Sequence, residues 1–294
     1  MDTTGDTTTD ANLELERVLH YSAFTADGRG GNPAGVVLDA DPATDDTTRQ
    51  RIAAAVGYSE TAFVEAPGVD GVRRVRYFSP EAEVDFCGHA TVAAAVALAD
   101  RGESGSLAFA INAGRVDVHT GDTPEGRAAT LTSVPTRTRA AEPDELAAAL
   151  AALRWTPADL DPRYPPHVAY AGNDHLVLAV RERATLAALD YDYPALAALM
   201  AERVWTTVHV VWAQSPTEFA ARDPFPPGGV VEDPATGAAA AAFGGYLREL
   251  GLVELPARVT IEQGVDMGHP SRLLVDIAAD DPRVRVTGVA VRTR

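Results

Sequence analysis

Residues 86–91 read Phe-Cys-Gly-His-Ala-Thr, and residues 232–237 read Glu-Asp-Pro-Ala-Thr-Gly. Each stretch is a polar turn with a glycine, and each leads into an alanine-rich segment, 90–100 and 238–250. Alanine has the highest helix propensity, and a glycine follows each segment where a helix is expected to stop. The two turns lie about half the chain length apart. This favours an internal duplication, although alanine-rich helices after glycine turns are common.

Short segments typical of β-strands surround these two helices. They are rich in β-branched residues and are bounded by Gly, Pro, Asp or Asn. The predicted strands are 18–24, 35–40, 61–65, 72–79, 106–111, 115–119, 128–134, 175–180, 206–212, 217–221, 258–263 and 272–278. The other predicted helices are 45–56, 143–154 and 193–203. Strands interleaved with isolated helices favour an α+β fold over regular βαβ alternation.

The duplication predicts two domains. A Pro-, Arg- and Ala-rich region at 135–165 is expected to connect the two halves, with one domain over 17–134 and the other over 135–283. The head of the chain, 1–16, carries acids and threonines and is predicted to be a disordered, solvated leader. It lacks the basic and apolar regions of a signal peptide.

The formal net charge of −17 argues against nucleic acid and anionic membrane surfaces as partners, because both would repel the chain. No apolar run reaches the ~20 residues that span a bilayer. The single cysteine excludes an intrachain disulfide framework. We therefore predict a cytoplasmic protein whose partner is a small molecule.

All 25 residues in the combined Lys and Arg count are arginines. Without a lysine amine, the chain cannot form a Schiff base with pyridoxal phosphate or an aldol substrate, and it cannot build a Walker-type phosphate loop. A G-x-G-x-x-G turn after a strand is also missing, which disfavours a nicotinamide enzyme. We predict chemistry that uses neither an organic cofactor nor a metal.

The two helix starts favour a particular chemistry. A helix N-terminus presents N–H groups and a partial positive charge, so it attracts anions. Two such starts facing one substrate carboxylate would also stabilise the enolate-like charge that develops when the adjacent carbon loses a proton. This arrangement suits racemisation, epimerisation or a proton shift.

The proton carriers are then expected among a few polar residues near the turns. Glu60 stands at a helix-to-strand junction, poised for partial burial, although spacing alone favours an exposed turn acid. Asp233 has a competing interpretation as an N-cap with Pro234 in the first helical position. His89 could be a satisfied core histidine, and Cys87 a small buried hydrophobe.

Six motifs occur in one order from about residue 18 to about residue 290. They are 30–38 (GGNPAGVVL), 59–64 (SETAFV), 75–84 (VRYFSPEAEV), 87–91 (CGHAT), 232–237 (EDPATG), and 263–264 (QG) with 267–268 (MG) and 270–272 (PSR). In this order they resemble the phenazine-biosynthesis PhzF family. The resemblance implies the diaminopimelate-epimerase fold, with two pseudo-repeated α/β-roll domains, each wrapping strands around a central helix. It also implies an active site between the domains, return of strand 284–294 to the first domain, and a homodimer.

The resemblance also implies roles for individual residues. The family's catalytic glutamate falls on Glu60, with Asp233 and His89 as the other catalytic candidates. The implied substrate-binding positions are Asn32, Cys87, Gly88, Gly237 and Ala238. Related epimerases use two opposed cysteines, whereas this chain has only one. The family usually has Ser at the position of Ala238, so the usual dihydro-hydroxyanthranilate substrate is in question.

The predicted function is therefore a cofactor-independent isomerase or epimerase that moves a proton on a small carboxylate-bearing metabolite through Glu60. One alternative is an epimerase or racemase of an amino-acid-like substrate that uses Cys87 and Asp233. Another is a non-catalytic binding protein on the same fold.

Overall fold

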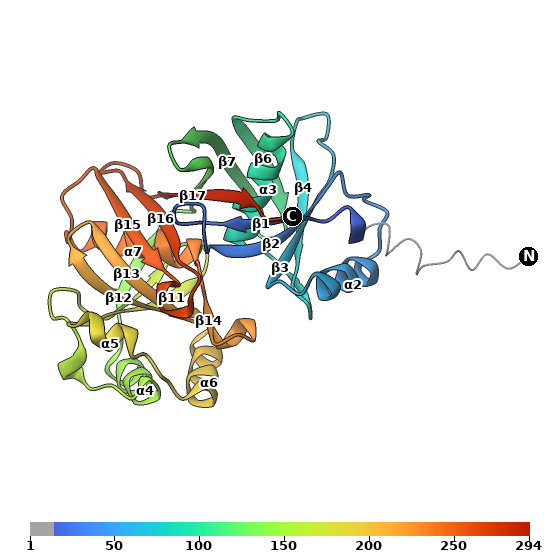
Figure 1. Ribbon diagram of the computed structural model, residues 1–294. Coiled ribbons are helices and arrows are strands. Elements are labelled where there is room, and N and C mark those ends of the chain that lie inside the picture. The colour runs from blue at the N-terminus through green and yellow to red at the C-terminus, as the bar shows by residue number, and fades with distance from the viewer. Residues whose placement is uncertain (1–14) are drawn as a thin grey trace, which may run out of the picture. The chain divides into compact units, whose positions relative to one another are not determined.

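The computed structural model describes residues 15–294, so nearly all of the predicted leader lies outside the described residues. The chain divides into two compact units (Figure 1). Of the described residues, unit 1 contains 15–28, Asn32–Leu131 and Gly288–Arg294, and unit 2 contains Arg29–Gly31 and Thr132–Thr287. None of the helices in the described part is long and apolar enough to cross a membrane.

Unit 1 is a ring of strands around a helix. Its strands are β1 (Leu19–Ala23), β2 (Asn32–Leu38), β3 (Glu60–Val64), β4 (Arg73–Phe78), β5 (Glu83–Val84), β6 (Ser106–Ile111), β7 (Gly114–Thr123), β8 (Gly126–Thr132) and the second half of β17 (Val284–Arg292). Pairing runs in the order β1-β2-β3-β4-β6-β7-β8-β17, and β17 pairs again with β1. Helix α3 (Gly88–Asp100) packs against β1, β2, β3 and β7 (Figure 1). Helix α2 (Asp46–Val56) packs against β3 and β4.

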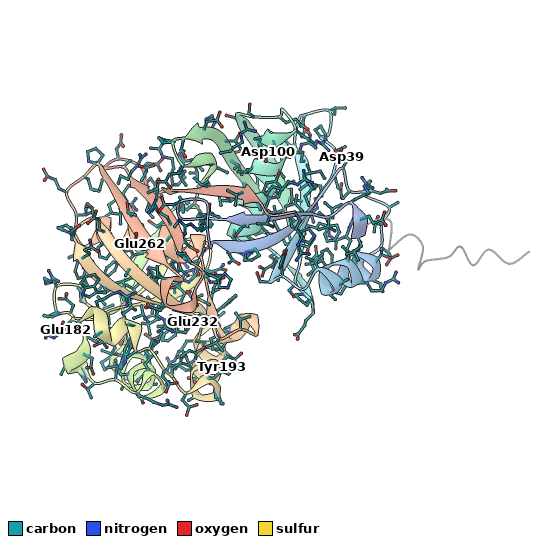
Figure 2. The ribbon with its side chains drawn as sticks, in the orientation of Figure 1. Asp39, Asp100, Glu182, Tyr193, Glu232 and Glu262 are labelled. Carbon is teal, nitrogen blue, oxygen red and sulfur yellow. The ribbon has the colours of Figure 1, made fainter. Side chains whose placement is uncertain are left out.

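The composition of α3 explains its central place. Every residue from His89 to Ala99 is buried, and most of them are Ala or Val. A helix that is apolar all round is stable only when surrounded, and small side chains let the strands approach it closely. At its C-terminal end, Asp100 (Figure 2) accepts hydrogen bonds from the Tyr21 hydroxyl at 2.7 Å and from Arg127 at 2.9 Å.

Unit 2 also wraps strands around a central helix, but its strands pair as an open series and not as a ring. They are β9 (Arg137–Ala140), β10 (His167–Tyr170), β11 (Asp174–Ala179), β12 (Trp205–Ser215), β13 (Glu218–Pro224), β14 (Glu232–Asp233), β15 (Ala257–Gln263), β16 (Ser271–Ile277) and the first half of β17. Helix α7 (Gly237–Glu249) packs against β9, β10, β11 and β16. A Cβ added to Gly245 would lie 2.3 Å from the Thr136 hydroxyl oxygen, so close packing of this helix requires glycine there.

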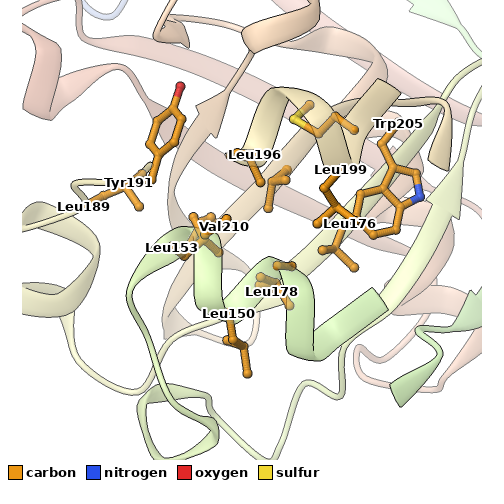
Figure 3. Close-up of a cluster of buried hydrophobic side chains, with 14 of the residues drawn as sticks. Leu150, Leu153, Leu176, Leu178, Leu189, Tyr191, Leu196, Leu199, Trp205 and Val210 are labelled. Atoms are coloured by element: carbon orange, nitrogen blue, oxygen red, sulfur yellow. The ribbon is translucent and has the colours of Figure 1, made fainter. Parts of the chain in front are cut away.

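A second layer covers the other face of the unit 2 sheet. It contains α4 (Pro143–Leu153), the short α5 (Arg183–Ala187) and α6 (Tyr193–Arg203). Their apolar side chains meet those of β11 and β12 in one cluster, which includes Leu150, Leu176, Leu196 and Val210 (Figure 3). Residues 135–165, predicted to connect the halves, thus contain β9 and α4.

A buried polar cluster lies within unit 2. His175 Nδ1 is 2.8 Å from the Thr207 hydroxyl, and His209 Nδ1 is 2.6 Å from Asp223 Oδ1. The His209 ring also packs against Phe243 of α7, with centroids 5.3 Å apart. Among the described residues, His175 Nε2, His209 Nε2 and Asp223 Oδ2 have no hydrogen-bond partner. Such buried polar atoms destabilise the fold relative to a fully paired arrangement.

The burial of His175 predicts acid sensitivity. Burial, with a smaller contribution from His209, lowers the pKa of His175 from 6.5 to about 3. The unfolded chain then binds this proton below about pH 6.5 and the folded chain only below about pH 3, so stability falls as the pH drops between these values. At pH 4.5 the loss is on the order of 2–3 kcal/mol.

We expect His175→Gln to remove this part of the pH dependence. Urea unfolding at pH 7 and pH 4.5 should show a smaller loss of unfolding free energy for His175→Gln than for the wild type. His119→Gln, which replaces an exposed histidine, is the control and should keep the wild-type loss. Equal losses in all three proteins would show that His175 does not titrate in this range.

Candidate active site

Three predicted residues meet at the start of α3. Glu60 is the first residue of β3, which pairs in parallel with β2 and so lies beside the central helix. Its Oε2 atom is 3.3 Å from His89 Nε2 and 3.5 Å from Cys87 Sγ. The Cys87 sulfur is also 3.3 Å from His89 Nδ1. A carboxylate, an imidazole and a thiol thus lie in mutual contact, and we call Glu60, Cys87 and His89 the triad.

Two further residues of unit 1 hold the His89 ring. The Asn32 Nδ2 atom is 3.1 Å from His89 Nδ1, and the Ser59 hydroxyl is 3.3 Å from His89 Nε2. Burial lowers the pKa of His89, and the neighbouring carboxylate of Glu60 opposes that shift only in part. The imidazole is therefore neutral near pH 7. With the Asn32 amide donating to Nδ1, the ring proton is on Nε2 and is donated toward Glu60.

Other contacts fix the first turn of α3. Cys87 occupies the N-cap position without a side-chain capping bond, and its exposed fraction is 7%. Its carbonyl accepts a 2.6 Å hydrogen bond from the Thr91 hydroxyl, which is itself 2.7 Å from the hydroxyl of the fully buried Tyr77. These contacts fix the N-cap residue and the first turn of the helix.

The second turn has its own network in unit 2. The Asp233 carboxylate accepts a 2.7 Å hydrogen bond from the Thr236 hydroxyl. The Gln263 side chain donates to the Asp233 carbonyl at 2.7 Å and accepts from the Thr236 amide at 3.1 Å. Helix α7 begins at Gly237 with Thr236 as its N-cap residue. The interpretation of Asp233 as an N-cap before a helical Pro234 is therefore wrong, because the turn continues for three more residues.

An ion pair anchors the segment that carries Asp233. Glu232 (Figure 2) forms a two-point salt bridge with Arg222, one of whose contacts is 2.8 Å long. Arg222 also donates to the carbonyls of Leu186 and Ala187, at 3.1 and 2.9 Å. Both members of the pair are buried. Bidentate Arg–carboxylate pairs fix orientation well, so β14 is held rigidly next to the turn.

The two central helices differ from α2 and α6 at their N-termini. The N-cap aspartates of α2 and α6, Asp45 and Asp192, accept hydrogen bonds from first-turn amides, whereas α3 and α7 have no side-chain capping bond. Both central helices also begin with glycine, at Gly88 and Gly237. A helix start of this kind offers its amides and its partial charge to an anion.

The structure groups the predicted site residues as two sets. Asn32, Glu60, Cys87, Gly88 and His89 lie together in unit 1, while Asp233, Gly237 and Ala238 lie together in unit 2. In the sequence, Asn32 was assigned to substrate binding, and the structure places its amide against His89.

Sequence reasoning assigned no role to Ser59 or Gln263. Both belong to the six motifs, and each lies at one end of a strand. Ser59 precedes the first residue of β3, and Gln263 ends β15 just before Gly264, whose φ is 73°. The available signal was a polar residue at one end of a strand, next to a turn.

Two rolls, each with a buried helix that begins at a polar turn, define an epimerase-like class of α+β protein. The crystal structure of a PhzF-family phenazine biosynthesis protein from Bacillus anthracis matches this fold with a TM-score of 0.83. The match covers 94% of this chain and 96% of that chain at 27% identity. It confirms the predicted α+β fold.

The family model of phenazine biosynthesis-like proteins, PhzC-PhzF, matches residues 21–294, and the chain belongs to this family. An uncharacterized isomerase of Deinococcus radiodurans is 34% identical, over 94% of this chain and 91% of that protein. The trans-2,3-dihydro-3-hydroxyanthranilate isomerase of Pseudomonas aeruginosa is 29% identical, over 94% of this chain and 95% of that protein. The family resemblance drawn from the six motifs is confirmed.

Proposed function

We propose that this protein is an isomerase that moves a proton between two carbons of a small carboxylate-bearing metabolite. The observation that carries the proposal is the position of Glu60. Its half-buried carboxylate lies 3.3 Å from a neutral imidazole, at the start of a helix without a side-chain cap. The names of the relatives, which are isomerases, support the same reaction type.

The proposed reaction has two proton transfers. The substrate carboxylate binds at a helix start, where amides and the helix dipole stabilise it. A Glu60 carboxylate oxygen takes the proton from a neighbouring carbon, and the electron pair of that C–H bond remains on the substrate as enolate-like charge. The protonated Glu60 then returns the proton to a different carbon. His89 orients Glu60, and Asp233 holds the substrate or serves as a second proton station.

We propose that no organic cofactor takes part. The support is the absence of lysine, which removes the pyridoxal and aldolase routes.

The substrate is named only by class. Ala238 lies half-buried in the first turn of α7, so this helix start offers a methyl group where the family usually offers a hydroxyl. The homodimer and the cytoplasmic location stay predictions.

Proton exchange in heavy water tests the proposal directly. The purified protein is incubated in D₂O with a panel of small carboxylates, including trans-2,3-dihydro-3-hydroxyanthranilate and amino acids, and deuterium in each compound is followed by NMR. At least one compound should gain deuterium at carbon, without added cofactor and in the presence of a chelator. A panel without exchange would favour the non-catalytic binding protein.

One contact favours a second candidate, an epimerase in which Cys87 is the base. The Cys87 sulfur is 3.5 Å from Glu60 Oε2, a geometry in which the carboxylate can accept the thiol proton. With one cysteine in the chain, a symmetric two-thiol mechanism is impossible, so Asp233 would have to act as the opposing acid. In this reaction deuterium would enter the same carbon that lost the proton.

A further inference from the structure

The Glu60, Cys87 and His89 side chains also form a set of metal ligands. Their donor atoms, one from each residue, all lie within 4.8 Å of one another. The three distances are 3.5 Å from Cys87 Sγ to Glu60 Oε2, 3.3 Å from His89 Nε2 to Glu60 Oε2, and 3.8 Å from Cys87 Sγ to His89 Nε2. No other such group occurs among residues 15–294.

These distances match the spacing of donors around one tetrahedral ion. Zinc binds Cys sulfur at about 2.3 Å, His nitrogen at about 2.0–2.1 Å and carboxylate oxygen at about 2.0–2.2 Å. Tetrahedral angles then place the donors about 3.4–3.6 Å from one another. The three atoms of the triad are within a few tenths of an ångström of this spacing, so an ion could bind with little rearrangement.

The surroundings of the triad fit a ligand set. A ligating histidine usually donates its second ring N–H to a neighbouring oxygen. The Asn32 amide already contacts His89 Nδ1, and rotation of that amide would present its oxygen to the ring. The Glu60 side chain is 13% exposed, against 6% for His89, so an ion would approach past the carboxylate. Three protein ligands leave a fourth position for water.

We propose that Glu60, Cys87 and His89 form a binding site for thiophilic divalent cations such as Zn²⁺ and Cd²⁺. Binding itself depends only on this geometry. Its consequence, inhibition, rests on the proposed function, since an ion on Glu60 Oε2 would occupy the group that transfers the proton. The site is then a point at which metal availability controls the enzyme, and a chelator would restore activity.

Cobalt is a suitable probe because Co²⁺ bound to a thiolate has a charge-transfer absorption band. The untagged full-length protein, freed of metal, is titrated with Co²⁺ and then with Zn²⁺. The chain has a single cysteine, so any such band reports Cys87. We expect a band that saturates at one equivalent, disappears in Cys87→Ser and is displaced by Zn²⁺. A titration that gives no band at stoichiometric Co²⁺ would overturn the proposal.

Variants and a protection experiment complete the test. Zn²⁺ affinity, measured by calorimetry, should fall about 100-fold or more in Glu60→Gln, beyond the range typical of an outer-shell partner. His119→Gln, an exposed histidine of β7, should bind Zn²⁺ normally. In the wild-type protein, Cd²⁺ should slow alkylation of Cys87, a readout that does not depend on any variant folding. Unchanged Zn²⁺ affinity in Glu60→Gln, or unchanged alkylation with Cd²⁺, would refute the site.

The two proposals fail separately. Inactivity toward every carboxylate would refute the isomerase while leaving the cobalt band in place. A missing cobalt band would refute the metal site while deuterium exchange continued.

Discussion

Glu60→Gln is expected to lower turnover by ~10²–10⁴-fold, the usual cost of removing a positioned proton-transfer group. Glutamine keeps the shape of the side chain and still accepts a hydrogen bond from His89, so the fold and substrate binding should change little. It cannot take up a proton. Single-turnover incubation in heavy water should therefore show almost no deuterium in the product, while the melting temperature stays close to that of the wild type.

Two further variants are needed to interpret this result. Glu81→Gln, which changes an exposed glutamate of unit 1, should retain full activity. Cys87→Ser should keep most activity if the thiol only packs against Glu60 and His89, whereas a loss of several orders of magnitude would favour the Cys87 epimerase. Deuterium exchange at nearly the wild-type rate in Glu60→Gln would show that Glu60 is an ordinary turn residue.

Asp233→Asn is expected to weaken substrate binding as well as catalysis. The substitution removes a buried negative charge but keeps an oxygen that can accept from the Thr236 hydroxyl, so the turn should survive. A hydrogen bond to a charged group contributes about 1.5–3 kcal/mol, which corresponds to a loss of about 10–100-fold in kcat/KM. We expect KM to rise and kcat to fall, in contrast to Glu60→Gln, where kcat alone should change.

Steady-state kinetics on the substrate found by the exchange panel would check this. Asp190→Asn, an exposed aspartate of unit 2, is the matched control and should have wild-type kinetics. A lower melting temperature with unchanged kcat and KM in Asp233→Asn would assign Asp233 to the structure of the turn alone.

Local sequence patterns predicted the helices well, for physical reasons. Helix α6 is predicted at 193–203 and is found at Tyr193–Arg203, because Pro194 marks its start and the β-branched run that begins at Val204 ends the alanine- and leucine-rich pattern. Short strands were harder to predict from the sequence. β10 has only four residues, after two prolines, and was not predicted. Its strand character comes from its pairing partners, β9 and β11.

The site was predictable in its members but not in its contacts. Family motifs indicated Glu60 and His89, which are 29 positions apart in the sequence. Their 3.3 Å contact depends on how β3 packs beside α3, which local sequence does not encode. The hydrogen bond from Gln263 to the turn around Asp233 likewise depends on the fold. It joins the end of β15 to a turn that precedes α7, and the whole helix lies between them in the sequence.

The last strand determines when this protein can fold during its synthesis. In β17, Val286 pairs with Val275 of β16, and Arg292 pairs with Tyr21 of β1, near the other end of the chain. Domains usually fold in order as they leave the ribosome. Here the ring of unit 1 lacks the strand between β1 and β8 until Gly288–Arg294 emerge. Unit 1 therefore stays open until β17 has been made, and a nascent chain that stops before Gly288 would leave its ring incomplete.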